Sequence, residues 1–239
     1  MCIRRLGTAR NQEPQGGTVG DMTVTEELRL GDAFAVLGCA PLVDAMGRVH
    51  NHRAHVLPLA SPEPGRHLFG QAATIAYMPW RDDVEQCSQT FADFFCRAAG
   101  ESPGGKVLVL SSGGYPEASH GGGTKLSRVA RHGLAGVLAD GRLRDFGELR
   151  EHGFSTWCRG EATRWGGDTV TPYAADVAVE FAGVCIVPGD YVFADTSGAV
   201  VVPARSLGRV LAVAQEIEAE DARSVQEIRS ERYPRQEPS

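Results

Sequence analysis

Seven consecutive residues, 139–145 (ADGRLRD), hold two aspartates and two arginines directly after the apolar run HGLAGVL. An arginine can bind a carboxylate through two parallel hydrogen bonds, and an aspartate can bind a divalent cation. The same charges can equally form exposed ion pairs, each worth less than about 1 kcal/mol. Their position in the fold must therefore decide between a ligand site and a solvated turn.

A glycine-rich loop lies just before this stretch. The apolar run KVLVL ends at SSGGYPEASHGGGTKL, and a helix is expected over residues 124–133. Glycine lets the backbone approach a ligand closely, and the first amides of a helix attract an anion. Ligands of open α/β sheets lie beyond the carboxyl ends of the strands, so the loop and residues 139–145 are expected to meet. The loop lacks the GK[ST] ending and the GxGxxG order of nucleotide sites, and alone it is equally well a surface loop.

Apolar patterning predicts strands that alternate with helices. Helices are expected over residues 30–47 with a turn at Ala40-Pro41, 83–99, 124–133 and 204–229. Strands are expected over residues 70–78, 104–110, 135–140, 154–160, 176–187, 190–195 and 199–203. This order predicts an α/β fold with a parallel layer and a mixed or barrel-like part. We expect one domain over residues 23–230, between an N-terminal tail (1–22) and a C-terminal tail (231–239).

Composition narrows the classes of function. The net charge of −6 argues against a general nucleic-acid binder, and no apolar run approaches the roughly 20 residues of a membrane span. The six cysteines form no CxxC pair and lie mostly in apolar segments. They are expected to be buried free thiols. A cytoplasmic protein without nucleic-acid or membrane partners is the resulting prediction.

Five ordered motifs resemble those of the RraA-like family. They are LVDAMG (42–47), GQAATI (70–75), GGKVLVL (104–110), the run from RHGLAGVLADGRLRD to WCRG (131–160), and VCIVPGDYVFADTSGAVVVP (184–203). The family includes 4-hydroxy-4-methyl-2-oxoglutarate aldolases and regulators of ribonuclease E activity. The resemblance covers about residues 28–230. It implies an α/β fold, namely a single αββα-type sandwich domain with a C-terminal helix, assembled as a homotrimer or homohexamer.

The resemblance also implies roles for individual residues. Arg144 would bind the carboxylate of a small 2-oxo acid, and Asp145 would hold a divalent metal, Mg²⁺ or Mn²⁺. The remaining substrate-binding residues would be Gly121, Gly122, Gly123, Thr124, Lys125 and Leu126. Such a site fits a metal-dependent lyase that works by aldol cleavage or decarboxylation through a metal-stabilised enolate. Recruitment of this chemistry to a biosynthetic pathway is a further option.

The chain departs from the family pattern at Gly123, where the aldolases have an acidic residue at the helix start. This departure keeps a second hypothesis open, a non-catalytic binding protein like the ribonuclease E regulators. His120 and Glu117 lie in the same loop, and we take His120 as a candidate acid or base. We expect Asp140 to bind backbone amides around Gly141 rather than a metal. Arg142 is expected to be the surface member of the motif.

Other polar clusters have weaker claims to function. His50, His52 and His55 have spacing that could bind zinc, but a polar loop is the favoured interpretation. Arg81 and Asp82 could shape a cleft or form a surface turn. The acidic side chains of the C-terminal helix could serve a neighbouring subunit, although a solvated helix face is the default expectation. These acidic residues are Glu216, Glu218 and Glu220.

Overall fold

The computed structural model describes residues 24–83 and 89–231. The predicted tails, apart from Glu231, lie outside the described residues. The helices are α1 (Val24–Leu37), α2 (Cys39–Val49), α3 (Phe91–Ala99), α4 (Gly123–Arg131), α5 (Phe146–Glu151), the 3₁₀ turn η1 (Ala204–Ser206) and α6 (Leu207–Ser230). The strands are β1 (His55–Val56), β2 (Leu68–Pro79), β3 (Val107–Leu110), β4 (Ser119–Gly121), β5 (Gly136–Ala139), β6 (Arg142–Leu143), β7 (Ser155–Trp157), β8 (Val170–Ala175), β9 (Val179–Phe181), β10 (Val184–Ile186), β11 (Tyr191–Asp195) and β12 (Gly198–Val202).

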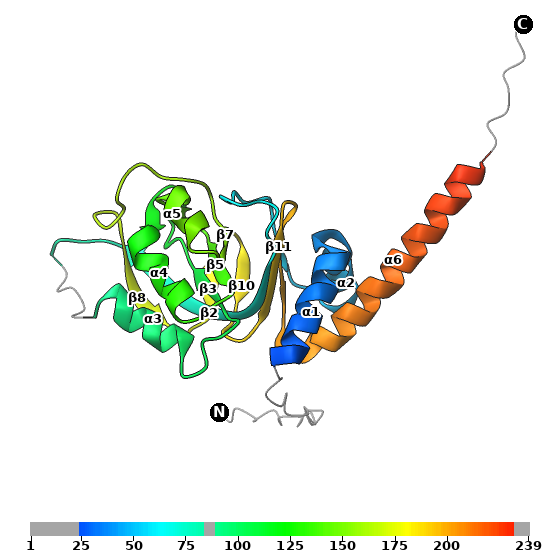
Figure 1. Ribbon diagram of the computed structural model, residues 1–239, viewed down its shortest axis with the longest axis horizontal. Helices are drawn as coiled ribbons and strands as arrows, with labels where there is room; N and C mark the ends of the chain where they lie inside the picture. The colour runs from blue at the N-terminus through cyan, green and yellow to red at the C-terminus, as the bar shows by residue number, and fades with distance from the viewer. Residues whose placement is uncertain (1–23, 84–88, 232–239) are drawn as a thin grey trace, which may run out of the picture.

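Within the described residues, eight strands form one sheet with a parallel and an antiparallel part. Its order is β1-β12-β11-β2-β3-β5-β7, and β8 pairs with the end of β2. The strands β2, β3, β5 and β7 run parallel, whereas β11, β12 and β1 are antiparallel. The long strand β2 joins the two parts, because its first residues pair with β11 and its middle pairs with β3. Figure 1 shows α3, α4 and α5 on one side and α1, α2 and α6 on the other.

Side-chain alternation along the strands produces four layers. In β3, Leu108 faces the helices α3, α4 and α5, whereas Val109 faces the interior between the two parts of the sheet. In β12, Val201 faces that same interior, whereas Val200 packs against α1, α2 and α6. Every other strand residue therefore enters a different core, as a strand with two buried faces requires. The predicted αββα-type sandwich with a C-terminal helix is confirmed.

The structure corrects the predicted strand over residues 176–187. This segment is a hairpin of β9 and β10. Its turn has two residues, Ala182 and Gly183, with φ of 52° and 83°. Positive φ at both central residues is the geometry of the tight turns that connect paired strands. The apolar pattern continues across the turn, which hid it in the sequence.

Two predicted helix boundaries are also wrong. The break in residues 30–47 lies at Gly38, with φ of 74°, because Pro41 is tolerated in the first turn of α2 where its missing N–H costs no hydrogen bond. Helix α3 begins at Phe91, because residues 89–90 are not helical, and residues 84–88 of the predicted helix lie outside the described residues. Thr90 and Asp93 form a capping box there, which satisfies the first amides of the helix.

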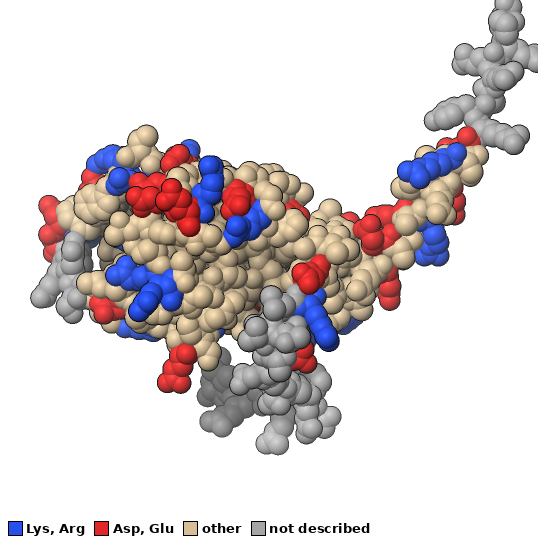
Figure 2. All heavy atoms as spheres, in the orientation of Figure 1, with Lys and Arg blue, Asp and Glu red and all other residues tan. Residues whose placement is uncertain are grey.

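Helix α6 extends away from the body of the molecule. Its first turns pack through Val210, Ala214 and Ile217, and its residues from Glu218 onward are exposed. Figure 1 shows this arm leaving the α1–α2 side, and Figure 2 shows acidic and basic side chains interspersed along it on the viewed face. Among the described residues no single helix is long and apolar enough to cross a membrane. One bent pair, Arg29–Leu37 with Cys39–Val49, meets the length and composition criteria together, with a bend of 97°.

Candidate functional site

Pairing between β4 and β6 brings the glycine-rich loop to the ADGRLRD stretch. The two strands run parallel, with Ser119 opposite Arg142 and Gly121 opposite Leu143. The next contact continues this pairing, because the Arg144 N–H donates to the Gly121 carbonyl at 2.9 Å. The meeting of loop and motif expected from the sequence is therefore present. It results from a small second sheet that the sequence analysis did not predict.

A cavity of about 180 Å³ lies where these segments meet. It is lined by Ser119, Gly121, Gly122, Thr124, Lys125, Arg144, Asp145 and Trp165. Six of these residues are predicted site residues. Three other predicted residues, His120, Gly123 and Leu126, do not line it. The cavity has room for a small organic anion, given about 30 Å³ for each displaced water.

Arg144 and Asp145 present their charged groups to this cavity without forming a close pair. The nearest Arg144 Nη2 to Asp145 Oδ1 distance is 3.9 Å, and each side chain is about one third exposed, 37% and 36%. Asp145 has left-handed backbone dihedrals, φ 65° and ψ 47°, and is the N-cap of α5. Its Oδ2 accepts the Gly123 N–H at 3.2 Å. Aspartate tolerates this conformation better than most residues, and the conformation lets its carboxylate lie beside the start of α4.

The start of α4 supplies backbone donors. The first bond of the helix joins the Leu126 N–H to the Gly122 carbonyl at 3.0 Å, so the Thr124 and Lys125 amides precede the hydrogen-bond ladder. The first turn holds no acidic residue and no side-chain cap. The Leu126 side chain is fully buried in the core, so it cannot contact a ligand in the cavity.

Lys125 adds a partly buried cation to the lining. Its Nζ lies over the Phe91 ring, 5.7 Å from the centroid. Burial, with a contribution from Arg128, lowers the pKa of Lys125. The amine therefore lies against apolar surface, while the positive end of the α4 dipole faces the cavity beside Arg144.

His120 occupies a structural position. It is 1% exposed, with Nδ1 2.9 Å from the Ala118 carbonyl and Nε2 3.0 Å from the Ser112 carbonyl. Its ring packs edge-on against Tyr77, and a Cβ on Gly141 would lie 2.7 Å from its Cγ. Burial lowers the pKa of His120 despite the two carbonyls that favour its charged form. We therefore do not include His120 among the groups that transfer protons in the proposals below.

The remaining charged residues of the motif have partners outside the cavity. Asp140 Oδ1 accepts two hydrogen bonds from Arg159, from Nε at 2.9 Å and from Nη2 at 2.6 Å, and not from the backbone amides that we expected. Arg142 Nε donates to Glu117 Oε2 at 2.6 Å. Arg142 and Glu117 both line a neighbouring cavity of about 600 Å³.

Two lining residues, Ser119 and Trp165, were not predicted from the sequence, and Trp165 is the more exposed of them. It is 58% exposed and lines both cavities, and Gly167 packs against its ring. An exposed tryptophan in the polar segment TRWGGD was the available signal, since exposed aromatic residues on loops often serve binding. The larger cavity also holds Tyr115, 43% exposed.

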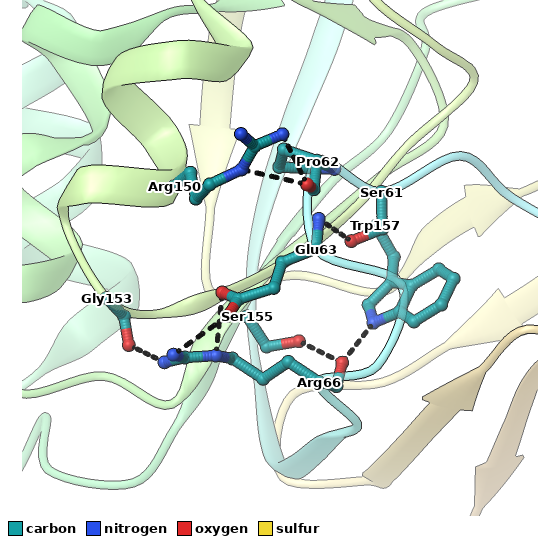
Figure 3. Close-up of polar contacts among 8 residues, drawn as sticks. All are labelled: Ser61, Pro62, Glu63, Arg66, Arg150, Gly153, Ser155 and Trp157. Atoms are coloured by element: carbon teal, nitrogen blue, oxygen red, sulfur yellow. Dashed lines mark hydrogen bonds and ion pairs between the residues drawn. The ribbon is translucent and has the colours of Figure 1, made fainter.

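The loop over residues 61–66 fixes α5, which carries Asp145 as its N-cap. Arg150 donates to the Pro62 carbonyl from Nε and Nη2 at 3.1 and 2.9 Å, and Arg66 donates to the Gly153 carbonyl after the helix. The Arg66 carbonyl accepts the Trp157 indole N–H at 3.3 Å. Figure 3 shows these contacts converging on the end of α5 and on β7. They hold the helix against the sheet from the end opposite Asp145.

The other polar clusters lie elsewhere. His50 Nε2 is 2.9 Å from Ser206 Oγ, and the rings of His50 and His52 are 4.9 Å apart. Glu220 pairs with Arg48 at 2.9 Å. Arg81 pairs with Asp83 at the end of β2. No group of three or more His, Cys, Asp or Glu side chains within residues 24–83 and 89–231 could hold a metal ion by itself.

The described cysteines are free. Cys39 and Cys158 are buried as expected, and burial raises the pKa of Cys158 to about 11. Cys96 and Cys185 are exposed, contrary to the prediction, because each lies on the outward face of its helix or strand. The predictions for Cys2 and Cys87 lie outside the described residues.

Comparison with known proteins places the chain in a family. The model of the RraA-like family, described as Aldolase/RraA, matches residues 39–201, which is more than half of the chain. The chain therefore belongs to the RraA-like family, as its motifs indicated. The mixed α/β fold and the C-terminal helix agree with this membership.

Individual relatives carry two kinds of names. A protein of Paraburkholderia phytofirmans named "Putative 4-hydroxy-4-methyl-2-oxoglutarate aldolase" is 34% identical over 144 residues, 59% of this chain and 84% of that protein. One of the same name from Albidiferax ferrireducens is 34% identical over 111 residues, 42% of this chain and 58% of that protein. The crystal structure of RraAS2 from Streptomyces coelicolor, titled an unusual member of the RNase ES inhibitor RraA protein family, matches with a TM-score of 0.71. It is 28% identical, over 83% of this chain and 98% of that one.

The matches span only part of several curated relatives. For three of them the matched share is between 23% and 66% of the relative's length. The comparisons show membership of the RraA-like family. Reaction, substrate and partners are matters of proposal.

Proposed function

We propose that this protein is a divalent-metal-dependent lyase that breaks a carbon–carbon bond in a small 2-oxo acid, by aldol cleavage or by decarboxylation. The observation that carries the proposal is the convergence of Arg144, Asp145 and the start of α4 on one small cavity. The aldolase names of the relatives agree with it. The location proposed for this reaction is the cytoplasm, where free thiols such as Cys158 remain reduced.

Substrate binding follows from the donors around the cavity. The Arg144 guanidinium can hold a carboxylate through two parallel hydrogen bonds, which a lysine could not do. The amides of Thr124 and Lys125 at the α4 start can donate to an oxygen of the same acid. The larger cavity, which shares Trp165, leaves room for the part of the substrate beyond the 2-oxo acid.

The residues present fit a Mg²⁺ or Mn²⁺ ion held by few protein ligands. Asp145 supplies a hard carboxylate oxygen at the cavity, and its Oδ2 lies 2.5 Å from the point where a Cβ on Gly122 would stand. Mg²⁺ typically keeps several waters and takes one or two carboxylates, in agreement with the lack of a larger ligand group in the part of the chain described. Such a cation, when bound, polarises the keto oxygen and stabilises the negative charge of an enolate.

The test is an assay of purified protein on a panel of 2-oxo acids, with Mg²⁺ or Mn²⁺ and with a chelator. We expect release of pyruvate or CO₂ from at least one acid, and loss of the activity on chelation. A folded protein that releases neither from any acid would contradict the proposal.

A non-catalytic binding protein, like the ribonuclease inhibitor relatives, is the second candidate. Two observations favour it: the match to nearly the whole RraAS2 structure and the absence of an acidic residue in the first turn of α4. It predicts a stable complex with a ribonuclease E-type protein that is unaffected by chelator. A co-purification in which no such complex forms would count against it.

We also propose a homotrimer or homohexamer, on the basis of the family membership. Exposed apolar side chains on the paired strands β2 and β8 and just after β8, namely Met78, Tyr173 and Val177, offer surface for such contacts. Light scattering after size exclusion would measure the mass, and a monomer would contradict this assembly. Neither nucleic acid nor membrane is proposed as a partner.

A further inference from the structure

Glu148 lies over the first turn of α4. A Cβ built on Gly123 would overlap its carboxylate and would stand 2.7 Å from Glu148 Cδ and 2.8 Å from Glu148 Cβ. Real Cβ atoms essentially never approach other atoms so closely. Gly123 is not among the residues with positive φ. A glycine is therefore needed at this position for the space that it leaves and not for its backbone conformation.

The neighbouring glycine has a matching relationship with Asp145. A Cβ on Gly122 would stand 2.5 Å from Asp145 Oδ2 and 3.1 Å from Arg144 Cβ. Two consecutive glycines thus accommodate two carboxylates from the start of α5. Asp145 is the N-cap of α5 and Glu148 is its third helical residue, and both carboxylates lie against the start of α4.

Within the described residues, the Glu148 carboxylate has no hydrogen-bond or ion-pair partner. A glutamate at the third position of a helix often caps the helix start, but α5 has no such side-chain cap. The Phe146 amide donates instead to Glu161 Oε1 at 2.9 Å. Close by, His152 Nε2 lies 3.1 Å from the Gly123 carbonyl. The carboxylate of Glu148 is thus not engaged by its own helix.

We propose that Glu148 is the second carboxylate of the cation site, an inference that rests on the function proposed above. Asp145 and Glu148 would offer hard oxygens from one side of α5, and water and substrate would supply the other ligands. Arg144 and the α4 amides would hold the anionic end of the substrate. Charges of opposite sign would then be separated within one site, with the cation beside the carboxylates and the substrate carboxylate beside Arg144.

Cation binding to the full-length protein without substrate tests the inference directly. Titration of Mn²⁺, followed by its electron paramagnetic resonance signal, measures the affinity. We expect Glu148→Gln to weaken Mn²⁺ binding by about 10-fold or more, in the range found when groups that support a metal site are removed. The matched control is Glu151→Gln at the exposed end of the same helix, which should bind Mn²⁺ like the wild type.

A relocated carboxylate provides the sharper test. In Gly123→Asp/Glu148→Gly the acid comes from α4, and the glycine at 148 removes the Cβ that would otherwise stand 2.8 Å from the new Cβ at 123. We expect this double variant to bind Mn²⁺ at least about 5-fold more tightly than Gly123→Ala/Glu148→Gly, which has the same backbone changes without an acid. Equal affinity of the two double variants would overturn the assignment.

The outcomes separate this inference from the proposed function. If the wild type binds Mn²⁺, Asp145→Asn weakens binding and Glu148→Gln does not, then the inference fails and the proposed function stands. If the wild type binds no Mn²⁺ while its fold is intact, both fail. Loss of affinity in Glu148→Gln, with an unchanged melting temperature, supports the role of Glu148.

Discussion

Two aspartates five residues apart in the ADGRLRD stretch lie in opposite environments. The Asp140 side chain is 4% exposed and accepts two hydrogen bonds from Arg159 at 2.9 and 2.6 Å. The Asp145 side chain is 36% exposed, and the nearest Arg144 nitrogen is 3.9 Å away. In the first pair, the carboxylate and the guanidinium are hydrogen-bonded to each other. The second leaves carboxylate oxygens and guanidinium donors available to a ligand.

The difference teaches that charge density in a motif does not by itself define a site. Asp140 follows β5 directly and lies in the interior, where an unpaired carboxylate would be costly. Asp145 follows β6 and begins α5, where its left-handed backbone places it beside the glycines of α4. We therefore expect Asp140 to serve stability and Asp145 to serve binding. A third pair, Arg142–Glu117, is more exposed than Asp140–Arg159 and should contribute little to either.

The largest expected effect is the loss of enzymatic activity when Arg144 or Asp145 is replaced. Arg144→Ala and Asp145→Asn should each lower kcat/KM by about 10²- to 10³-fold, because each removes a charged group aimed at the reacting acid. Steady-state rates with the best 2-oxo acid would measure this loss. Arg131→Ala, at the exposed end of α4, is the control and should be fully active. Retained activity in Asp145→Asn would remove that residue from the proposed site.

The next largest effect is the loss of stability when the Asp140–Arg159 pair is broken. Asp140→Ala should lower the free energy of unfolding by about 2 to 3 kcal/mol, because Arg159 loses its partner. The value lies below that for a fully buried pair, since the Arg159 side chain is 32% exposed. Urea unfolding measures it, with the exposed Asp221→Ala as a control. A change below about 0.5 kcal/mol would show that the pair is not structural.

A smaller effect is expected on the way the free energy of unfolding depends on pH. Burial lowers the pKa of His120 in the folded protein, so the unfolded chain binds the proton more readily. His120 therefore favours folding above its unfolded pKa of about 6.5, and this contribution is lost as the pH falls below that value. The slope for one proton is at most about 1.4 kcal/mol per pH unit. His120→Gln should flatten the pH dependence of unfolding between pH 7 and 5, whereas an unchanged slope would contradict a lowered pKa of His120 in the folded protein.

The smallest effect on stability is expected when the exposed Arg142–Glu117 pair is broken. Arg142→Ala should change the free energy of unfolding by less than about 1 kcal/mol, because the Glu117 side chain is 76% exposed and remains solvated. Urea unfolding beside Asp140→Ala gives the comparison within one experiment. A loss as large as that of Asp140→Ala would mean that the two pairs do not differ as described.

Much of the fold could be predicted from the sequence, because apolar periodicity marks buried strands and helices directly. The strands around Val109 and Val201 and the helix that starts at Gly123 were found in this way. The hairpin at Ala182-Gly183 was not, because its apolar pattern continues through the turn. The short strands β4 and β6 depend on pairing between distant segments, which local patterns do not encode.

The candidate site was predictable where it rests on motifs. Arg144 and Asp145 line the cavity together with four of the loop residues expected from the sequence. Glu148 and Trp165 were missed, because their positions depend on how α5 and a loop pack in three dimensions. The burial of His120 beneath Gly141 could not be seen in a glycine-rich loop sequence for the same reason, and its role as an acid or base stays a prediction.

The most direct test of the central claim is calorimetric titration of pyruvate into the wild type and into Asp145→Asn, each with and without Mg²⁺. We expect this result if Arg144 and Asp145 form one site for an acid and a cation: Mg²⁺ tightens pyruvate binding to the wild type by about 10-fold or more. In Asp145→Asn, the affinity for pyruvate should be the same with and without Mg²⁺. Pyruvate binding that is equally tight in all four titrations would contradict the claim.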